Sequence, residues 1–231
     1  MGTTAIIVAA GSGLRMGGPL PKAFAELAGV PMVEHSLRLF QDHPEVQSIV
    51  LMVPAGSLAP ASDLARAYGK VVAVAEGGRR RQDTVRSALG HARRAAGGGG
   101  GGLVLVHDAA RPLATPALVS AVLAAAARHG AAVPGVAPAD TVREVAEGPA
   151  GRLIGAATLD RRRVVLVQTP QAFALDLLEE AHAAADSEAT DDGALVERLG
   201  RPVEVVPGEP GNFKITTPED LARARAVLAG R

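Results

Sequence analysis

Residues 5–22, AIIVAAGSGLRMGGPLPK, join a short apolar run to a glycine-rich segment with two cations, Arg15 and Lys22. The apolar run at 5–10 has the character of a central parallel strand that is buried on both faces. Glycines let the backbone approach a ligand closely and turn its amide N–H groups towards anionic oxygens. Because open α/β sheets bind ligands where their strands end, this segment predicts a cradle for nucleotide phosphates.

Two common nucleotide-binding motifs do not fit this segment. In the dinucleotide fingerprint G-x-G-x-x-G counted from Gly11, the sixth position is Met16, and no acidic residue ends a second strand about 20 residues further on. In the Walker pattern, Gly13 and Gly18 have the right spacing but are followed by a proline instead of a lysine. The mismatches argue against a nicotinamide oxidoreductase and a P-loop NTPase, and leave a plain flexible turn as the alternative to a phosphate cradle.

The composition favours one cytoplasmic domain that acts on a small molecule. A chain of 231 residues is long enough for a single α/β domain with a sizeable core, and we expect one domain over 1–231. Lys plus Arg and Asp plus Glu are both 24, so no global field attracts nucleic acid or a membrane. The sequence has no cysteine, which excludes thiolate chemistry, and its aromatic content of 2% argues against base-stacking surfaces.

Apolar periodicity along the chain predicts strands and helices in alternation. Strands are expected at 5–10, 49–53, 71–74, 103–106, 131–137, 164–167 and 203–206. Helices are expected at 31–41, 60–68, 85–92, from 116 onwards, and at 174–184, 191–199 and 218–228, with Thr190 and Thr217 as the N-caps of the last two. The predicted fold class is α/β, a Rossmann-like, mostly parallel twisted sheet flanked by helices.

Two further segments place charged residues at the same edge of the predicted sheet. Residues 77–81, GGRRR, follow a predicted strand, and a solvated arginine cluster is the alternative to an anion site there. Asp108 ends another predicted strand, where a carboxylate could hold Mg²⁺, orient a sugar hydroxyl or cap a turn. The shared position at the sheet edge favours ligand contact in both cases.

The alternation of strands and helices stops after residue 137. Residues 140–145 and 152–159, on either side of a GPAG turn, are typical of a long β-hairpin. An isolated two-stranded ribbon is only marginally stable and must bury its apolar side chains against something. We therefore expect 140–161 to form an extended β-arm, inserted in the domain, that packs on a second subunit.

Five separated strings resemble, in order, those of the 2-C-methyl-D-erythritol 4-phosphate cytidylyltransferases, a family of sugar nucleotidyltransferases. They are the glycine-rich opening, GGRRRQDT at 77–84, HDAARP at 107–112, TPQ at 169–171 and NFKIT at 212–216. The HDAARP string is what separates this resemblance from the ribitol phosphate cytidylyltransferases, which remain the alternative for the acceptor. The six glycines at 97–102 and the arginines at 162 and 163 are additional to the family pattern.

The resemblance implies transfer of CMP from CTP to 2-C-methyl-D-erythritol 4-phosphate, with release of pyrophosphate, in non-mevalonate isoprenoid synthesis. It further implies Mg²⁺, or another divalent cation, as cofactor and a homodimer whose arms interlock. A non-catalytic nucleotide-binding protein with the same fold is the alternative from another class.

The implied catalytic residues are Arg15, Lys22, Arg161 and Lys214. The implied nucleotide contacts are Ala9, Ala10, Gly11, Ser12, Gly13, Gly78, Arg81, Asp83, Thr84 and Ala109. The implied acceptor contacts are Asp108, which is also the candidate metal ligand, Arg111, Thr141, Thr169, Thr190 and Asp191.

Overall fold

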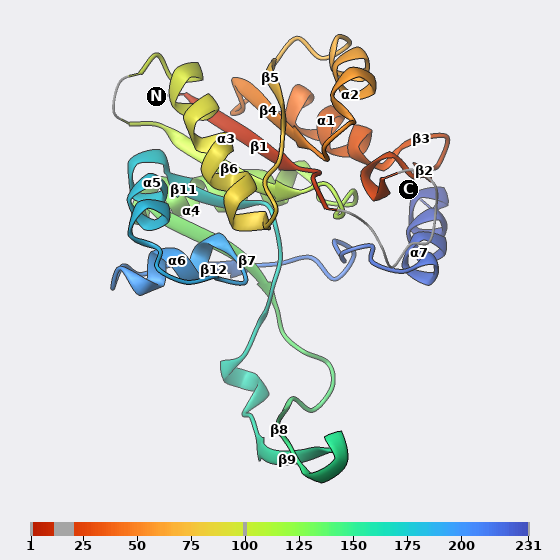
Figure 1. Ribbon diagram of the computed structural model, residues 1–231, viewed down its shortest axis with the longest axis vertical. Helices are drawn as coiled ribbons and strands as arrows, with labels where there is room; N and C mark the ends of the chain where they lie inside the picture. The colour runs from red at the N-terminus through yellow and green to blue at the C-terminus, as the bar shows by residue number, and fades with distance from the viewer. Residues whose placement is uncertain (1, 12–20, 99–100, 231) are drawn as a thin grey trace.

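A central twisted sheet organises the computed structural model, which describes residues 2–11, 21–98 and 101–230 (Figure 1). The eight strands of the sheet are β1 (Thr3–Val8), β4 (Ser48–Val53), β5 (Val71–Glu76), β6 (Leu103–Asp108), β7 (Ala131–Val136), β10 (Leu166–Val167), β11 (Gln171–Ala174) and β12 (Glu204–Pro207). Their order is β10-β7-β11-β6-β1-β4-β5, and β12 pairs with β7. The predicted α/β class is therefore confirmed.

Most neighbouring strands of this sheet run parallel, as expected. β1 lies between β6 and β4 and is parallel to both, β4 is parallel to β5, and β7 is parallel to β12. β11, which the sequence did not predict, inserts antiparallel between β6 and β7. Its sequence, QAFA, contains a single strong strand former, Phe173, so no strand pattern marks it. β10 also runs antiparallel to β7.

Helices cover both faces of the sheet. They are α1 (Met32–Asp42), α2 (Leu58–Ala65), α3 (Arg81–Ala95), α4 (Pro116–His129), α5 (Leu175–Ala184), α6 (Asp192–Arg198) and α7 (Pro218–Ala229). Side chains of α1 and α4 belong to one buried cluster, and those of α3, α5 and α6 to another. The β1 strand supplies Ile7 to the first cluster and Ile6 to the second, so its two faces are both buried, as the apolar run predicts.

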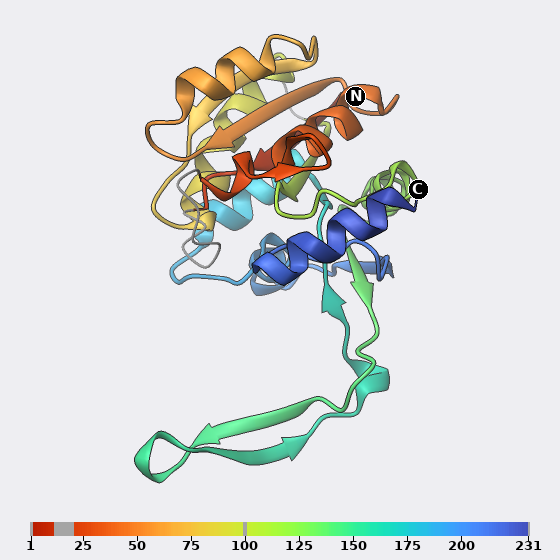
Figure 2. The same cartoon turned by 90° about the vertical axis from the view of Figure 1, so that its right-hand side faces the viewer.

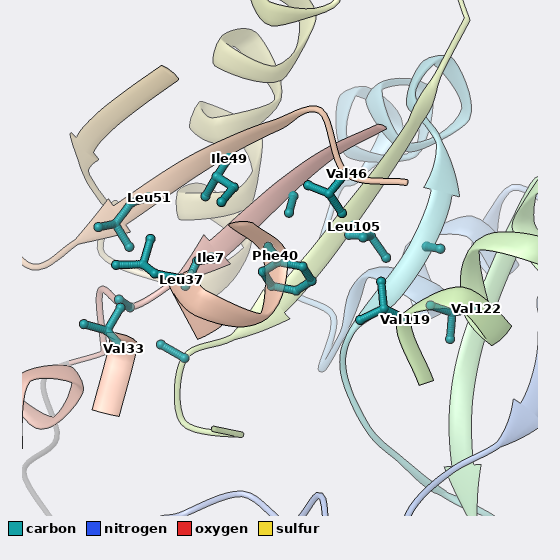
Figure 3. Packing of buried hydrophobic residues seen from close by; sticks show 14 of the residues in the cluster. Ile7, Val33, Leu37, Phe40, Val46, Ile49, Leu51, Leu105, Val119 and Val122 are labelled. Carbon is teal, nitrogen blue, oxygen red and sulfur yellow. The ribbon is translucent and has the colours of Figure 1, made fainter. Parts of the chain in front are cut away.

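The first cluster packs around Phe40 of α1 (Figure 3). Phe40, Ile7, Leu37 and Leu105 have no exposed surface, and Val119 of α4 joins them in the same cluster. Full burial of a side chain of this size contributes about 1.5–3 kcal/mol relative to leaving it in water. This packing holds the ends of β1 and β6 in fixed positions, and the candidate site lies at those ends.

Polar caps decide where several helices begin. Thr217 and Asp220 form a capping box at the start of α7, which confirms Thr217 as its N-cap. The expectation that Thr190 caps α6 is wrong, because the Asp191 carboxylate accepts from the Ala194 backbone N–H at 2.9 Å. Aspartate and threonine are both good N-caps, so sequence alone does not separate adjacent candidates. The helix α2 also begins two residues earlier than expected, at Leu58.

Two short ribbons lie outside the main sheet. The first pairs β2 (Glu26–Leu27) with β3 (Val30–Pro31) and was not expected from the sequence. The second pairs β8 (Arg143–Glu147) with β9 (Leu153–Thr158) and projects from the α/β body as an arm (Figure 2). Every residue of β8 and β9 is exposed in the single chain. Leu153, for example, keeps 73% of its surface open to solvent.

The helices of the described residues include none that is both long and apolar enough to cross a bilayer.

Candidate active site

A first hollow of about 550 Å³ opens where β1, β5 and β6 end. Several of the residues predicted to contact the nucleotide line this hollow: Ala9, Ala10, Gly11, Gly78, Arg81, Thr84 and Ala109. Lys22, Asp108 and Lys214 line it as well. Ser12, Gly13 and Arg15 lie outside the described residues. The lining also includes Arg79, Arg80, Ala110 and Thr216, which were not singled out from the sequence.

Glycines at the end of β5 let two loops of this hollow touch. A Cβ atom on Gly77 would lie 2.3 Å from the Cβ of Ala10 and 2.8 Å from Oγ1 of Thr84. The Gly78 N–H donates to Oγ1 of Thr84 at 3.0 Å, and that hydroxyl donates to the carbonyl of Arg80. The methyl group of Ala10, in the loop after β1, therefore packs directly on the backbone of Gly77 after β5, and no side chain fits between them.

Asp83, a predicted nucleotide contact, does not line either hollow in this structure. Its carboxylate accepts from Arg80 at 2.9 Å from Nε and at 2.7 Å from a terminal nitrogen. The hydrogen bonds from Arg80 hold the pKa of Asp83 below its ordinary value. The pair lies at the start of α3, where an acidic residue also suits the helix dipole.

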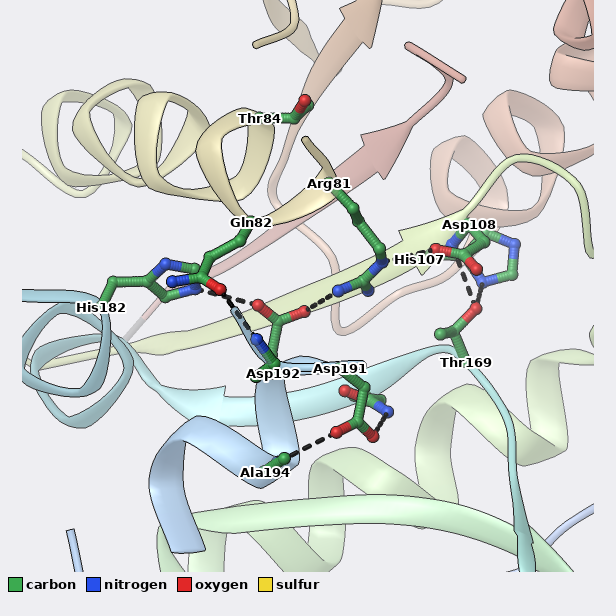
Figure 4. A network of polar contacts seen from close by, with 12 residues as sticks. Arg81, Gln82, Thr84, His107, Asp108, Thr169, His182, Asp191, Asp192 and Ala194 are labelled. Carbon is green, nitrogen blue, oxygen red and sulfur yellow. Dashed lines mark hydrogen bonds and ion pairs between the residues drawn. The ribbon is translucent and has the colours of Figure 1, made fainter. Parts of the chain in front are cut away.

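Asp108, at the end of β6, is the centre of the charged groups in the site (Figure 4). One carboxylate oxygen accepts from Nε of Arg81 at 3.0 Å, and the other accepts from Nζ of Lys214 at 2.6 Å. The Asp108 backbone N–H donates to Oγ1 of Thr169 at 3.0 Å. Burial alone would raise the pKa of Asp108, but Arg81 and Lys214 outweigh burial and hold that pKa well below its usual range.

Behind Arg81 lies a buried carboxylate that sequence reasoning did not assign to the site. Asp192 accepts from a terminal nitrogen of Arg81 at 2.7 Å and from Nε2 of His182 at 2.9 Å (Figure 4). Asp192 and His182 are each 1% exposed. Burial would raise the pKa of Asp192, whereas Arg81 and the hydrogen bond from His182 lower it, and the lowering prevails. Asp192 lies 111 positions from Arg81 and 10 positions from His182 along the chain, so no local motif joins the three residues.

A second hollow of about 440 Å³ adjoins the first. Predicted acceptor contacts line it: Asp108, Arg111, Thr169, Thr190 and Asp191. Arg81, Asp108 and Lys214 line both hollows and together form the shared wall between them. Arg111 is held beside it, since its guanidinium donates to the carbonyls of Asn212 at 2.9 Å and Val167 at 3.3 Å. Burial lowers the pKa of Arg111.

Two predicted residues of the acceptor side are not brought to the second hollow in the single chain. Arg161 is exposed at the base of the arm, where it donates to the carbonyl of Ala139 at 2.8 Å. Thr141 is also exposed and lines neither hollow. Both belong to the part of the chain that leads into or out of the arm, and so both lie away from the shared wall.

The described residues include no group of three or more His, Asp or Glu side chains placed to hold a metal ion. Both oxygens of Asp108 already accept a hydrogen bond, but a carboxylate has further lone pairs. Mg²⁺ is commonly held through one or two carboxylates together with substrate phosphates. The donor set here fits a cation that is shared with a nucleotide.

A glycine-walled hollow at the ends of parallel strands, joined to a second hollow by paired charges, is typical of a nucleotide-dependent transferase. Comparison with known proteins agrees with this class. The family model for IspD, 2-C-methyl-D-erythritol 4-phosphate cytidylyltransferase, matches residues 3–230. The chain belongs to this family of nucleotidyltransferases, which carry out CTP-dependent cytidylyl transfer to 2-C-methyl-D-erythritol 4-phosphate in the isoprenoid pathway. The match does not favour ribitol phosphate as acceptor.

Individual relatives cover nearly the whole chain. A 2-C-methyl-D-erythritol 4-phosphate cytidylyltransferase from Dehalococcoides mccartyi is 42% identical over 97% of this chain and 95% of its own length. A bifunctional IspD/IspF enzyme from Anaeromyxobacter is 45% identical, but the chain spans only 56% of that longer protein. The crystal structure of the cytidylyltransferase from Thermus thermophilus has a TM-score of 0.78 and 38% identity, with 99% of this chain and 100% of that chain covered.

The contact between the two glycine-bearing loops gives a first prediction. We expect Gly77→Ala to lower turnover about 100-fold, because the added methyl group displaces the loop after β1, and a shift of about 1 Å at reacting groups has an effect of that size. Gly69→Ala is the matched control, since a Cβ atom there meets nothing within 4 Å. Steady-state rates and thermal unfolding are measured for both variants. Equal activity of the two variants would show that the close approach is unimportant.

A second prediction concerns His107, which precedes Asp108 and is fully buried. Its Nδ1 lies 3.3 Å from Oγ1 of Thr169, and its ring meets the edge of Phe40 with 5.3 Å between the ring centroids. Burial lowers the pKa of His107 from 6.5 to about 4. The unfolded chain therefore binds a proton between these pH values that the folded chain does not, and stability is lost as the pH falls through this window.

We expect wild-type protein to lose about 3 kcal/mol more unfolding free energy than His107→Asn between pH 7 and pH 4, from about 1.36 kcal/mol for each pKa unit. The asparagine keeps a polar atom near the position of Nδ1 but does not titrate. Urea unfolding at a series of pH values measures the difference. Parallel curves for the two proteins would mean that His107 does not contribute to the acid sensitivity.

Proposed function

We propose that this chain performs the reaction of its family with CTP in the first hollow and 2-C-methyl-D-erythritol 4-phosphate in the second. The observation that carries the proposal is the shared wall, because Arg81, Asp108 and Lys214 belong to both hollows. Two substrates held on either side of one wall have their reacting groups close together. Such positioning can supply a large part of the rate enhancement in a transfer between two bound molecules.

In this reaction an oxygen of the acceptor phosphate attacks the α-phosphorus of CTP. A new phosphorus–oxygen bond forms, the bond between the α-phosphorus and the bridging oxygen to the β-phosphorus breaks, and pyrophosphate leaves with that electron pair. No protein nucleophile takes part. The protein must neutralise the charge of two polyanions and hold them in line, which is electrostatic catalysis of the phosphoryl-transfer kind.

The described cations suit these tasks. Lys22 lines the first hollow, where it would stabilise negative charge on the triphosphate, a role that we also assign to Arg15. Lys214 and Arg111 would hold the acceptor phosphate from the second hollow. Backbone groups of the glycine-bearing loops, with Thr84, would contact the cytosine and the ribose. Asp191 would contact a hydroxyl of the acceptor.

We further propose Mg²⁺ as the cofactor, held mainly by oxygens of the CTP phosphates and, on the protein side, by Asp108. When bound, it would add positive charge next to the phosphate oxygens and so complement Lys22. Asp108 supports this role because it is a low-pKa carboxylate at the edge of the first hollow.

We also propose that the working form is a cytoplasmic homodimer in which the arms meet. Apolar side chains on both strands of the arm are exposed in the single chain, with Val145 at 49% and Ile154 at 50%. Burial against a second copy would stabilise a ribbon that is marginal alone. It would also allow Arg161 and Thr141, which lie away from the second hollow of their own chain, to serve the acceptor site of the partner.

The test of the activity is Mg²⁺-dependent pyrophosphate release, measured with each of the four nucleoside triphosphates and with either 2-C-methyl-D-erythritol 4-phosphate or ribitol 5-phosphate. We expect release only with CTP and the methylerythritol phosphate. A Lys214→Ala preparation serves as a control for contaminating enzymes, because loss of one well-placed charge donor lowers turnover about 10²–10³-fold. Release with the ribitol phosphate would contradict the acceptor, and release with no pair would contradict the activity.

The test of the dimer compares two exposed valines on different parts of the chain. Val145→Asp places a charge on the arm, whereas Val72→Asp places one on β5 at a site of similar exposure, 54%. We expect only the arm variant to become monomeric in analytical ultracentrifugation, and we expect its specific activity to fall with the dimer. A wild-type protein that is monomeric at its working concentration would overturn the proposal.

A further inference from the structure

His182 and Asp192 form a buried pair close to the site, but neither residue lines the first or the second hollow. His182 is on α5, and Asp192 is the first residue of α6. The pair reaches the shared wall through Arg81, the first residue of α3. Hydrogen bonds therefore link three helices on one face of the sheet in series, from α5 through α6 to α3.

The contacts form an unbroken series from α5 to the shared wall. Nε2 of His182 donates to one oxygen of Asp192, whose other oxygen accepts from Arg81. Arg81 then donates through Nε to Asp108, which also accepts from Lys214. The remaining terminal nitrogen of Arg81 is buried and has no hydrogen-bond partner within the described residues. The Arg81 guanidinium is thus held by two ion pairs, one with Asp108 and one with Asp192.

The geometry of a guanidinium explains why both ion pairs matter. A single ion pair at Nε fixes one end of the group and leaves the side chain free to rotate about its other torsions. A second ion pair on a terminal nitrogen fixes the plane of the group, because the nitrogens are rigidly spaced. Asp192 can act as this second anchor only if its own carboxylate is held, and the hydrogen bond from His182 holds it.

We propose that His182 and Asp192 are positioning residues for the transfer reaction, which fix the orientation of Arg81 and, through Arg81, the placement of Asp108 and Lys214 in the shared wall. This inference rests on the proposed function, since it assigns the shared wall to the reaction. His182 acts at a distance, in the way that outer hydrogen-bond partners orient the ligands of a metal site.

The first experiment compares three substitutions of His182 with a matched histidine. His182→Leu removes the donor, His182→Gln keeps a donor near the position of Nε2, and His182→Asn has a shorter reach. His43→Leu is the control, since His43 is buried and hydrogen-bonded to Ser120 Oγ at 3.1 Å, but it has no link to Arg81. Loss of either histidine can lower stability, and only loss of His182 is expected to change the catalytic step.

We expect His182→Leu and His182→Asn to lower kcat about tenfold, with KM for both substrates changed less than about twofold, by analogy with losses of 10–100-fold on removal of outer partners. His182→Gln should stay within about threefold of wild type, and His43→Leu should keep its kcat. Equal kcat values for Gln and Asn at position 182 would overturn the proposal. So would an equal loss of kcat in His43→Leu. If the leucine variant does not fold, the comparison of Gln with Asn decides.

A second measurement separates this inference from the proposed activity. The terminal Nη–H signal of Arg81, from the nitrogen that bonds Asp192, is recorded by ¹⁵N NMR in substrate-free protein and assigned by its absence in Arg81→Lys. We expect a slowly exchanging signal in wild type and in His182→Gln, and a broadened or lost signal in His182→Asn. A sharp signal in the asparagine variant would contradict the positioning role even in an active enzyme. If wild type shows no turnover but the signals behave as expected, the anchoring stands and the proposed function fails.

Discussion

The paired contact of Asp108 with Arg81 and Lys214 is the interaction on which the site depends. It joins the end of β6 to the start of α3 and to the segment before α7, which lie far apart in the sequence. A buried carboxylate costs several kcal/mol unless it is paired and hydrogen-bonded, so these elements can come together only with the charges matched. The packing of α1 and α4 around Phe40 supplies the rigid support, and the ion pairs determine where the two hollows meet.

The fold could be predicted largely from local pattern. β1 reads as a strand because apolar residues fill both of its faces, and the capping box of α7 is visible as Thr217-Pro218 followed by Asp220. The strand β11 escaped prediction for a physical reason. β11 has four residues and draws its stability from pairing with β6 and β7, contacts that leave no periodic signal in the sequence. The N-cap of α6 is Asp191 and not the expected Thr190, because aspartate and threonine side chains can both accept a hydrogen bond from a backbone N–H in the first turn of a helix.

Some residues of the candidate site could likewise be predicted from local sequence pattern, and others could not. Residues that follow strands, such as Gly78, Asp108 and Ala109, could be placed at one edge because parallel strands end there. His182 and Asp192 could not, because their importance comes from contacts with Arg81 across the tertiary structure. Asp83 was expected at the nucleotide, and its competing pair with Arg80 forms over only three residues. A sequence motif does not show whether Asp83 binds a ligand or pairs with the nearby Arg80.

The touching loops at Ala10 and Gly77 have a consequence for how this protein can change over evolution. At this contact the small side chain of Ala10 lies against Gly77, so a larger residue at Gly77 has no room. The second hollow is lined by residues of varied chemistry, such as Arg111, Thr169 and Val167, which substitution can alter one at a time. Substitution is therefore more restricted at the Ala10–Gly77 contact of the first hollow than at these positions of the second.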